Sequence, residues 1–236
     1  MHGRLVVVTG VGREGQLGEA VAAAFAARGA VLALIDLDPS EVAARVRALH
    51  AAGATARGYS ADLTDAEATV ALAARVVADH PEQSGVAALV CLAGGFAATG
   101  PLDTSDAAVL HRQFAINVAT AYSATRAFLP ALRVARGSVV YMASAAVLPG
   151  GDVSGTAAYA IAKAGVLSLM RSVSQGEAVH GVRANAVAPQ AIRTAANLSS
   201  MGDGRRYVER GAVAEAVLWL VEGAGEFVTG QTIAMG

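Results

Sequence analysis

The chain has 236 residues, a formal net charge of −1 at pH 7 and a hydrophobic content of 54%. The near-zero charge gives it no general attraction to nucleic acid or to an anionic membrane. Charged and polar residues interrupt the apolar stretches, so none approaches the ~20 apolar residues that a membrane-spanning helix needs. We therefore expect a soluble protein with no nucleic-acid or membrane partner.

Other features of the composition bear on location and chemistry. The only cysteine, Cys91, rules out an internal disulfide and fits a reducing compartment. The N-terminus shows no signal-peptide pattern, so we expect a cytoplasmic protein. The five histidines are scattered without metal-ligand spacing, and we therefore expect no metal site.

The chain is long enough for one α/β domain with a sizeable core. Repeats, linkers and low-complexity segments are absent from the sequence, so we expect a single dinucleotide-binding and catalytic domain over residues 1–236. Short apolar runs alternate with helical patterns, which predicts a Rossmann-type, doubly wound parallel sheet of about seven strands flanked by helices. The expected strands span residues 5–9, 31–36, 54–60, 86–92, 138–144, 181–189 and 227–235.

The first part of the chain has the pattern of a dinucleotide-binding unit. The strand over 5–9 leads into a glycine-rich loop over 10–18, an Ala-rich helix and a strand that ends in Asp36. In such a unit the glycines let the pyrophosphate approach the helix N-terminus, and the acid can bond the adenosine ribose hydroxyls. An acid there repels a 2′-phosphate, so NAD(H) is favoured, and Arg13 keeps NADP(H) as the alternative.

The third strand delivers Asp62 and Leu63. Asp62 is placed to bond the adenine amino group while Leu63 packs on the adenine ring. The same run also has the pattern of a helix start, with Thr64 or Asp65 as the cap, and the two roles are compatible.

Small residues follow the fourth strand, where a cofactor or a neighbouring backbone can approach closely; they are Ala93, Gly94 and Gly95. A helical region begins at Thr104, and a long helix over 113–133 carries Asn117 in an otherwise apolar stretch. A polar residue on such a face is usually a satisfied core or interface residue.

The fifth strand ends in Ser144, and the loop over 145–157 leads into a helix with Tyr159 and Lys163. Residues four apart lie on one helix face, and an ammonium near a phenol favours the phenolate. The pair could therefore run acid–base chemistry at a carbonyl or carbinol oxygen. The pattern also occurs on many exposed helices, but Lys163 is the only lysine in a chain with 18 basic residues.

Beyond the sixth strand, residues 190–211 are predicted to form a mobile loop, followed by a last helix over 215–222. Taken together, these landmarks resemble the short-chain dehydrogenase/reductase family over essentially the whole chain. The matching residues are the glycine loop from Thr9-Gly10, Asp36, Asp62-Leu63, Ala93-Gly94, Asn117, Ser144, Tyr159-x-x-x-Lys163, Asn185-x-x-x-Pro189, Thr194 and Thr229-Gly230-Gln231.

The resemblance implies hydride transfer between a nicotinamide cofactor and a ketone, secondary alcohol or 3-oxoacyl substrate. By this resemblance Tyr159 is the general acid/base, and Lys163 lowers its pKa and holds the nicotinamide ribose. Ser144 orients the substrate oxygen, and Asn117 holds a water that links Lys163 to solvent. Residues 190–211 cover the substrate, and a homodimer or homotetramer is implied. The implied cofactor contacts are Gly10, Gly12, Arg13, Gly15, Leu17, Gly18, Asp36, Leu37, Asp62, Leu63, Ala93, Gly94, Gly95, Tyr159, Lys163, Pro189, Ile192 and Thr194.

The chain also departs from the family pattern. The glycine loop is longer than the usual Thr-Gly-x-x-x-Gly-x-Gly, with four residues between Gly10 and Gly15 and two between Gly15 and Gly18. Cys91 and Leu92 replace the two asparagines of an Asn-Asn-Ala-Gly stretch, so two polar groups that normally tie the sheet near the site are lost.

Smaller departures follow in the second half of the chain. Ser144 lies 15 positions before Tyr159, slightly more than usual, and Gln190 follows Pro189 where glycine is common.

Two alternative functions stay open at this point. The stretch 93–96, Ala-Gly-Gly-Phe, also resembles the dihydropteridine reductase branch, which uses NADH but lacks the serine that stands here at 144. The altered fourth strand would suit a family member that has lost catalysis and only binds a nucleotide. The complete set of four catalytic residues argues against that second alternative.

Overall fold

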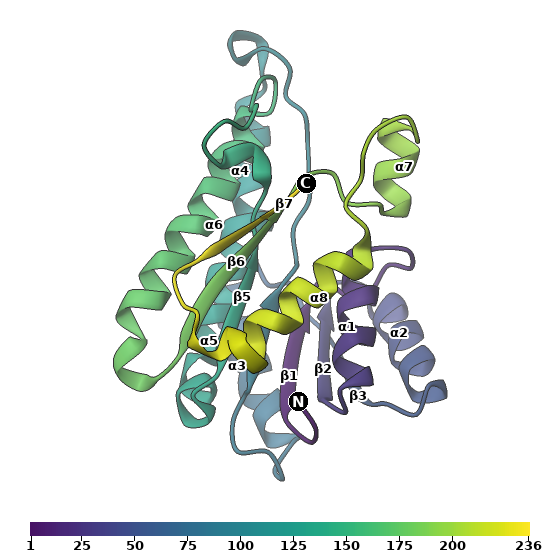
Figure 1. Cartoon of the computed structure of the whole chain (residues 1–236), viewed down its shortest axis with the longest axis vertical. Coiled ribbons are helices and arrows are strands. Elements are labelled where there is room, and N and C mark those ends of the chain that lie inside the picture. The colour runs from purple at the N-terminus through teal and green to yellow at the C-terminus, as the bar shows by residue number, and fades with distance from the viewer.

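A seven-stranded parallel sheet forms the centre of the molecule in the order β3-β2-β1-β4-β5-β6-β7 (Figure 1). The computed structural model describes residues 1–236, apart from the side chain of Ala224. The strands are β1 (Leu5–Thr9), β2 (Val31–Asp36), β3 (Thr55–Ser60), β4 (Ala88–Cys91), β5 (Ser138–Met142), β6 (Arg183–Pro189) and β7 (Thr232–Met235). This architecture confirms the predicted Rossmann-type fold.

Two layers of helices cover the sheet, as its apolar strands require. The helices are α1 (Leu17–Ala27), α2 (Pro39–Ala51), α3 (Ala66–Ala78), α4 (Ala107–Phe114), α5 (Thr120–Ala135), α6 (Ala157–Gly176), α7 (Ala195–Met201) and α8 (Arg210–Val221). Along β1, Leu5 and Val7 pack with α3, α5 and α6, whereas Val6 and Val8 pack with α1 and α8 on the opposite face. Because both faces are buried, β1 is a continuous apolar run rather than an alternating one.

The chain order of the strands reverses between β1 and β4. From β1 the chain builds outward to β3, and it then returns to β4 on the other side of β1. In open parallel sheets, ligands bind at such a switch point, beyond the carboxyl ends of the strands. The fold therefore directs attention to the loops that follow β1 and β4.

Several helix boundaries differ from the sequence prediction. The segment 190–211, predicted as a loop, contains α7, which Thr194 caps by accepting a hydrogen bond from the Asn197 amide at 3.1 Å. Helix α8 begins at Arg210 rather than near residue 215, and Arg210 in its first turn bonds Glu19 of α1 at 3.0 Å. The last strand is shorter than predicted: it begins at Thr232, after the 3₁₀ turn over Gly223–Phe227 and an irregular segment in which Gly230 has φ +72°.

The helix predicted over 113–133 is part of a longer helical run. It starts with α4, passes through a π-helical turn over Ala115–Ala119 and continues as α5. Of the two residues proposed to cap α3, Asp65 is the cap and accepts hydrogen bonds from two amides at 3.0 Å each. Among the described residues, no helix is long and apolar enough to cross a membrane.

Candidate active site

A groove with a volume of about 730 Å³ lies at the switch point, along the carboxyl ends of β1, β2 and β4. The glycine loop and the end of β2 form one part of it, and α6 with the stretch after β4 forms another. Helix α7 supplies part of the lining as well. The groove thus joins the region predicted for the adenosine to the Tyr159/Lys163 pair.

The glycine loop crosses the end of β4 at very short range. Gly10 has φ +75°, and a Cβ at this position would lie 2.6 Å from the Ala93 amide nitrogen. A Cβ on Gly18 would collide with the Gly10 carbonyl oxygen. A side chain at either position would push the loop away from the strand end, so both positions require glycine.

Thr9 ties the end of β4 to the glycine loop. Its hydroxyl accepts hydrogen bonds from the amides of Leu92 and Ala93 at 3.2 and 3.3 Å. These bonds hold the stretch after Cys91, where the family's asparagines are missing. In the absence of the two asparagine side chains, the end of β4 is held by hydrogen bonds from two of its backbone amides to the Thr9 hydroxyl.

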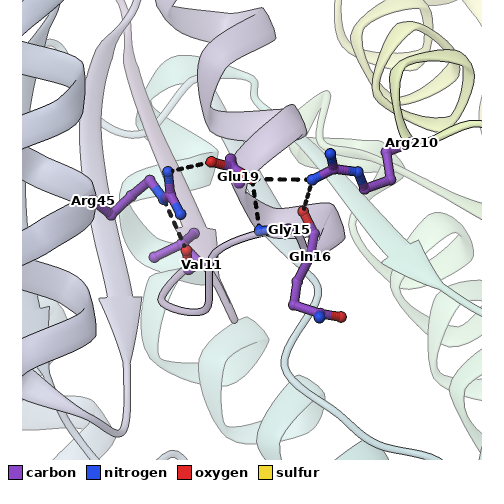
Figure 2. Close-up of polar contacts among 6 residues, drawn as sticks. All are labelled: Val11, Gly15, Gln16, Glu19, Arg45 and Arg210. Carbon is purple, nitrogen blue, oxygen red and sulfur yellow. Dashed lines mark hydrogen bonds and ion pairs between the residues drawn. The ribbon is translucent and has the colours of Figure 1, made fainter. Parts of the chain in front are cut away.

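A carboxylate holds the outer part of the glycine loop (Figure 2). Glu19, in the first turn of α1, accepts a hydrogen bond from the Gly15 amide at 2.9 Å. The same carboxylate pairs with Arg45 of α2 at 2.8 Å and with Arg210 of α8 at 3.0 Å. Although burial raises the pKa of Glu19, the Gly15 N–H and the two guanidinium groups hold it below its usual value.

Asp36 lies at the end of β2, on the groove wall. Its carboxylate accepts hydrogen bonds from the amides of Gly12 and Leu37, both at 2.7 Å. Glu41, in the first turn of α2, approaches the same place. A Cβ on Gly12 would lie 2.9 Å from Glu41 Oε2 and 3.2 Å from Asp36 Cγ, so two carboxylates lie within about 6 Å of each other.

The next strand end forms the other side of this region. Asp62 bonds the amide and hydroxyl of Thr64 at 2.8 and 2.7 Å, and these bonds lower its pKa. Leu63 is buried and lines the groove beside it. Asp62 therefore bonds Thr64 just before α3 and also lines the groove, so the two predicted roles are compatible.

Tyr159 and Lys163 lie on the groove side of α6. The ammonium of Lys163 is 5.8 Å from the centre of the Tyr159 ring and donates a hydrogen bond to the Met142 carbonyl at 2.9 Å. Phe96 packs edge-on against the Tyr159 ring, with the ring centroids 5.0 Å apart. An acid–base group, a cation and an apolar surface therefore meet at one end of the groove.

Burial controls the protonation of this pair. It lowers the pKa of Lys163 to about 8, because the ammonium is taken out of water. It raises the pKa of Tyr159, and the Ser144 hydroxyl opposes that rise. The resemblance implied that Lys163 would lower the pKa of Tyr159. In the structure the Lys163 ammonium instead donates to the Met142 carbonyl, and the Ser144 hydroxyl is the group that lowers this pKa.

Asn117 sits in the π-helical turn with 1% of its surface exposed. Its amide nitrogen donates to the Gly95 carbonyl and to the Gln113 carbonyl, both at 3.0 Å, and its Oδ1 accepts from the Gly95 amide at 3.2 Å. A Cβ on Gly94 would lie 2.5 Å from that oxygen and 3.6 Å from Lys163 Nζ. Asn117 therefore shapes the stretch after β4 and stands next to Lys163.

The chain matches the model of a family described as Enoyl-(Acyl carrier protein) reductase over residues 10–235. It is 35% identical to galactitol 2-dehydrogenase (L-tagatose-forming) of Cereibacter sphaeroides, over 100% of this chain and 94% of that protein. It is 30% identical to 2-(S)-hydroxypropyl-CoM dehydrogenase 3 of Xanthobacter autotrophicus, over 100% of this chain and 96% of that protein. The chain belongs to the short-chain dehydrogenase/reductase family.

Solved structures support the same assignment. The structure of levodione reductase superposes with a TM-score of 0.89 at 26% identity, over 99% of this chain and 96% of that chain. As a short-chain dehydrogenase/reductase, the protein belongs to a family of oxidoreductases that use nicotinamide cofactors.

The structure places most of the residues predicted to contact cofactor around one groove. Those that line it are Gly10, Arg13, Leu17, Gly18, Asp36, Leu37, Asp62, Leu63, Ala93, Gly94, Gly95, Tyr159, Lys163, Ile192 and Thr194. Three predicted residues are not part of this lining. The Gly12 amide donates to Asp36, the Gly15 amide donates to Glu19, and Pro189 is the last residue of β6. Ser144 and Asn117 also lie outside the lining, next to Tyr159 and Gly94 respectively.

Sequence reasoning missed other lining residues. They are Gln16, Ala61, Thr64, Leu92, Phe96, Ile116, Thr120, Met142, Ala196, Asn197 and Ser200. Phe96 had a signal, because an aromatic residue directly after the small stretch 93–95 falls beside the site. The α7 residues belong to the segment 190–211, which was expected to cover the substrate but was predicted without a helix.

Proposed function

We propose that this protein is an NAD(H)-dependent dehydrogenase/reductase that interconverts a secondary alcohol and its ketone. The observation that carries the proposal is that one groove is lined by Asp36, Tyr159 and Lys163, with the Ser144 hydroxyl beside Tyr159. The relatives above are named for the oxidation of alcohols, and levodione reductase is named for a reduction. These names support the substrate class.

The groove fits a nicotinamide dinucleotide. The absence of a Cβ at Gly10 and Gly18 lets the loop turn tightly against the Ala93 backbone and against itself, as the loop of a dinucleotide-binding unit does. Asp36 would hold the adenosine ribose and Lys163 the nicotinamide ribose. When bound, the cofactor would supply the hydride acceptor for the alcohol or the hydride donor for the ketone.

The protein's own residues would handle the proton. In alcohol oxidation the Tyr159 phenolate takes the hydroxyl proton of the substrate, and in ketone reduction the phenol returns a proton to the carbonyl oxygen. The Ser144 hydroxyl, which stands beside the phenol, would hold the same substrate oxygen in line. Phe96 would shield the substrate carbon from water.

The pteridine alternative has only the stretch 93–96 in its favour, whereas Ser144 supports a carbonyl or alcohol substrate. The inactive alternative leaves the burial of Lys163 beside Tyr159 without a purpose, because burying an ammonium is costly. The single domain over 1–236, the cytoplasmic location and a homodimer or homotetramer remain part of the proposal.

The test of this function is fluorescence titration of the purified protein with NADH, followed by turnover assays with secondary alcohols and ketones. The panel holds polyols, aliphatic alcohols and cyclohexanols, each with its ketone. Binding of NADH and turnover of at least one pair are expected. A protein that binds neither NADH nor NADPH would refute the proposal.

Cofactor choice gives a sharper prediction. NADH is expected to bind at least tenfold more tightly than NADPH, because the Asp36 carboxylate on the groove wall and the Glu41 carboxylate within about 6 Å of it would repel a 2′-phosphate. Replacing Glu41 by Gln should tighten NADPH binding severalfold and leave NADH binding unchanged. The measurement is the ratio of the two dissociation constants.

Glu67→Gln, in the exposed first turn of α3, is the matched control and should leave that ratio unchanged. Arg13 is exposed and makes no ion pair or side-chain hydrogen bond within the described part of the chain. Tighter binding of NADPH by the unmodified protein would show that Arg13 outweighs the two carboxylates.

A further inference from the structure

Residues 191–209 form a flap over the groove, between β6 and α8. The two ends of the flap are held together, since the Arg193 amide donates to the Val208 carbonyl at 2.9 Å and the Val208 amide donates to the Ala191 carbonyl at 2.8 Å. Helix α7 lies between these ends and supplies Ala196, Asn197 and Ser200 to the groove lining. The flap is therefore a loop whose two ends are joined at its base.

The flap is attached to the glycine loop at two points. The Ala195 amide, at the start of α7, donates to the Gly15 carbonyl at 3.2 Å. Arg210, directly after the flap, donates to the Gln16 carbonyl at 3.3 Å and to the Glu19 carboxylate at 3.0 Å (Figure 2). Gly15 and Gln16 lie in the part of the loop where this chain has extra residues relative to its family.

Glu19 stands at the centre of these contacts. One of its carboxylate oxygens accepts hydrogen bonds from the Gly15 amide and the Arg210 guanidinium, and the other accepts one from the Arg45 guanidinium (Figure 2). Arg45 in turn donates to the Val11 carbonyl at 3.4 Å, on the inner part of the loop. The two guanidinium groups and one carboxylate leave a net positive charge beneath the loop.

We propose that Glu19 and Arg210 form a latch, which holds the flap against the lengthened glycine loop and keeps both in the shape that binds cofactor. Both are positioning residues, since neither lines the groove. The latch makes flap closure and cofactor binding mutually dependent, so each should strengthen the other by the same factor. This inference rests on the proposed binding of a nicotinamide cofactor.

Arg210→Gln is the informative variant. About a third of the Arg210 side chain is exposed, and without it Glu19 still has Arg45 as a partner. Replacing Glu19 itself would leave the Arg45 side chain, which is 9% exposed, without its partner and endanger the fold. Glu19→Gln is therefore a second variant, used only if its melting temperature stays near that of the unmodified protein.

The measurement is amide hydrogen exchange of the flap, read by mass spectrometry on peptides that cover 194–208, with and without NADH. In Arg210→Gln, exchange of these peptides without cofactor should rise on the order of fivefold, and the NADH dissociation constant should rise by at most that factor, since it follows the fraction of protein with the flap closed. NADH should slow flap exchange in the unmodified protein. Exchange of the buried part of α8, from Val213 onward, should not change.

Arg28→Gln is the matched control. Arg28 also joins α1 to α8, through Glu222 and Glu215, but at the end of the helices remote from the loop. It should change neither flap exchange nor NADH affinity.

Unchanged flap exchange and unchanged affinity in Arg210→Gln would overturn the latch. If the unmodified protein fails to bind NADH, the proposed function and the coupling both fall. The exchange rates measured without cofactor decide the latch separately.

Discussion

Tyr159→Phe is expected to lower turnover at least a hundredfold, by the usual contribution of general acid–base catalysis, while NADH binding stays within about twofold. Phenylalanine keeps the ring, its edge contact with Phe96 and its packing on α6. The substitution removes only the hydroxyl that would exchange a proton with substrate oxygen. Turnover numbers and NADH dissociation constants of the two proteins measure the effect.

Tyr122→Phe on the exposed face of α5 is the matched control and should retain full activity. A Tyr159→Phe protein that keeps more than about a tenth of the turnover would exclude Tyr159 as the acid–base group. A protein that loses its fold together with its activity would not support the role either.

The pH dependence should follow the protonation of the same hydroxyl. Burial raises the pKa of Tyr159, so the phenol stays protonated through the neutral range. Alcohol oxidation needs the phenolate and should speed up as the pH rises, whereas ketone reduction needs the phenol and should slow down at high pH. The residual activity of Tyr159→Phe should lack both trends.

The sheet and the glycine loop were predictable because they obey local rules. The strands over 5–9 and 31–36 match the structure residue for residue, since a strand buried on both faces is a continuous apolar run with sharp ends. The acid at the end of β2 and the glycines before α1 follow from the same unit. Sequence pattern therefore located the part of the groove formed by the glycine loop and the end of β2.

The contacts that hold the groove in shape were not predictable. Three helices that are far apart in the chain supply Glu19, Arg45 and Arg210. The sequence around a charged residue does not indicate which opposite charge it pairs with in the fold. Helix α7 has only seven residues, several of them polar, so it is too short to show a periodic pattern of apolar residues. The cap provided by Thr194 was its one local signal.

The departures from the family pattern had consequences that the sequence alone did not reveal. Cys91 and Leu92 take the place of two asparagines, yet the Thr9 hydroxyl holds the amides of this stretch. The longer glycine loop presents the Gly15 and Gln16 carbonyls to the flap. In both cases a backbone group is bonded by a residue from a different element, which only the folded structure brings near.

Lys163→Met is expected to make the protein more stable and inactive. The folded structure lowers the pKa of Lys163 from 10.5 to about 8, so burial of the ammonium costs about 3 kcal/mol at neutral pH. Loss of the hydrogen bond to the Met142 carbonyl takes back about 1 kcal/mol, which leaves a net gain of roughly 2 kcal/mol. Denaturant unfolding measures this gain, and turnover should fall about a hundredfold because the nicotinamide ribose would lose the ammonium that holds it beside Tyr159.

The sign of the pH dependence identifies the cause. Between pH 8 and 10.5 the unfolded chain keeps a proton on Lys163 that the folded chain has lost, so the unmodified protein gains stability there as the pH rises. The advantage of Lys163→Met should thus be largest below pH 8 and shrink toward pH 10.5. Lys163→Arg is the opposite control, because a guanidinium cannot give up its charge, and it should be less stable than the unmodified protein at every pH. If Lys163→Met is instead less stable at pH 7, the ammonium is held by contacts that outweigh its burial, and Lys163 is a structural cation rather than a residue kept at a cost for catalysis.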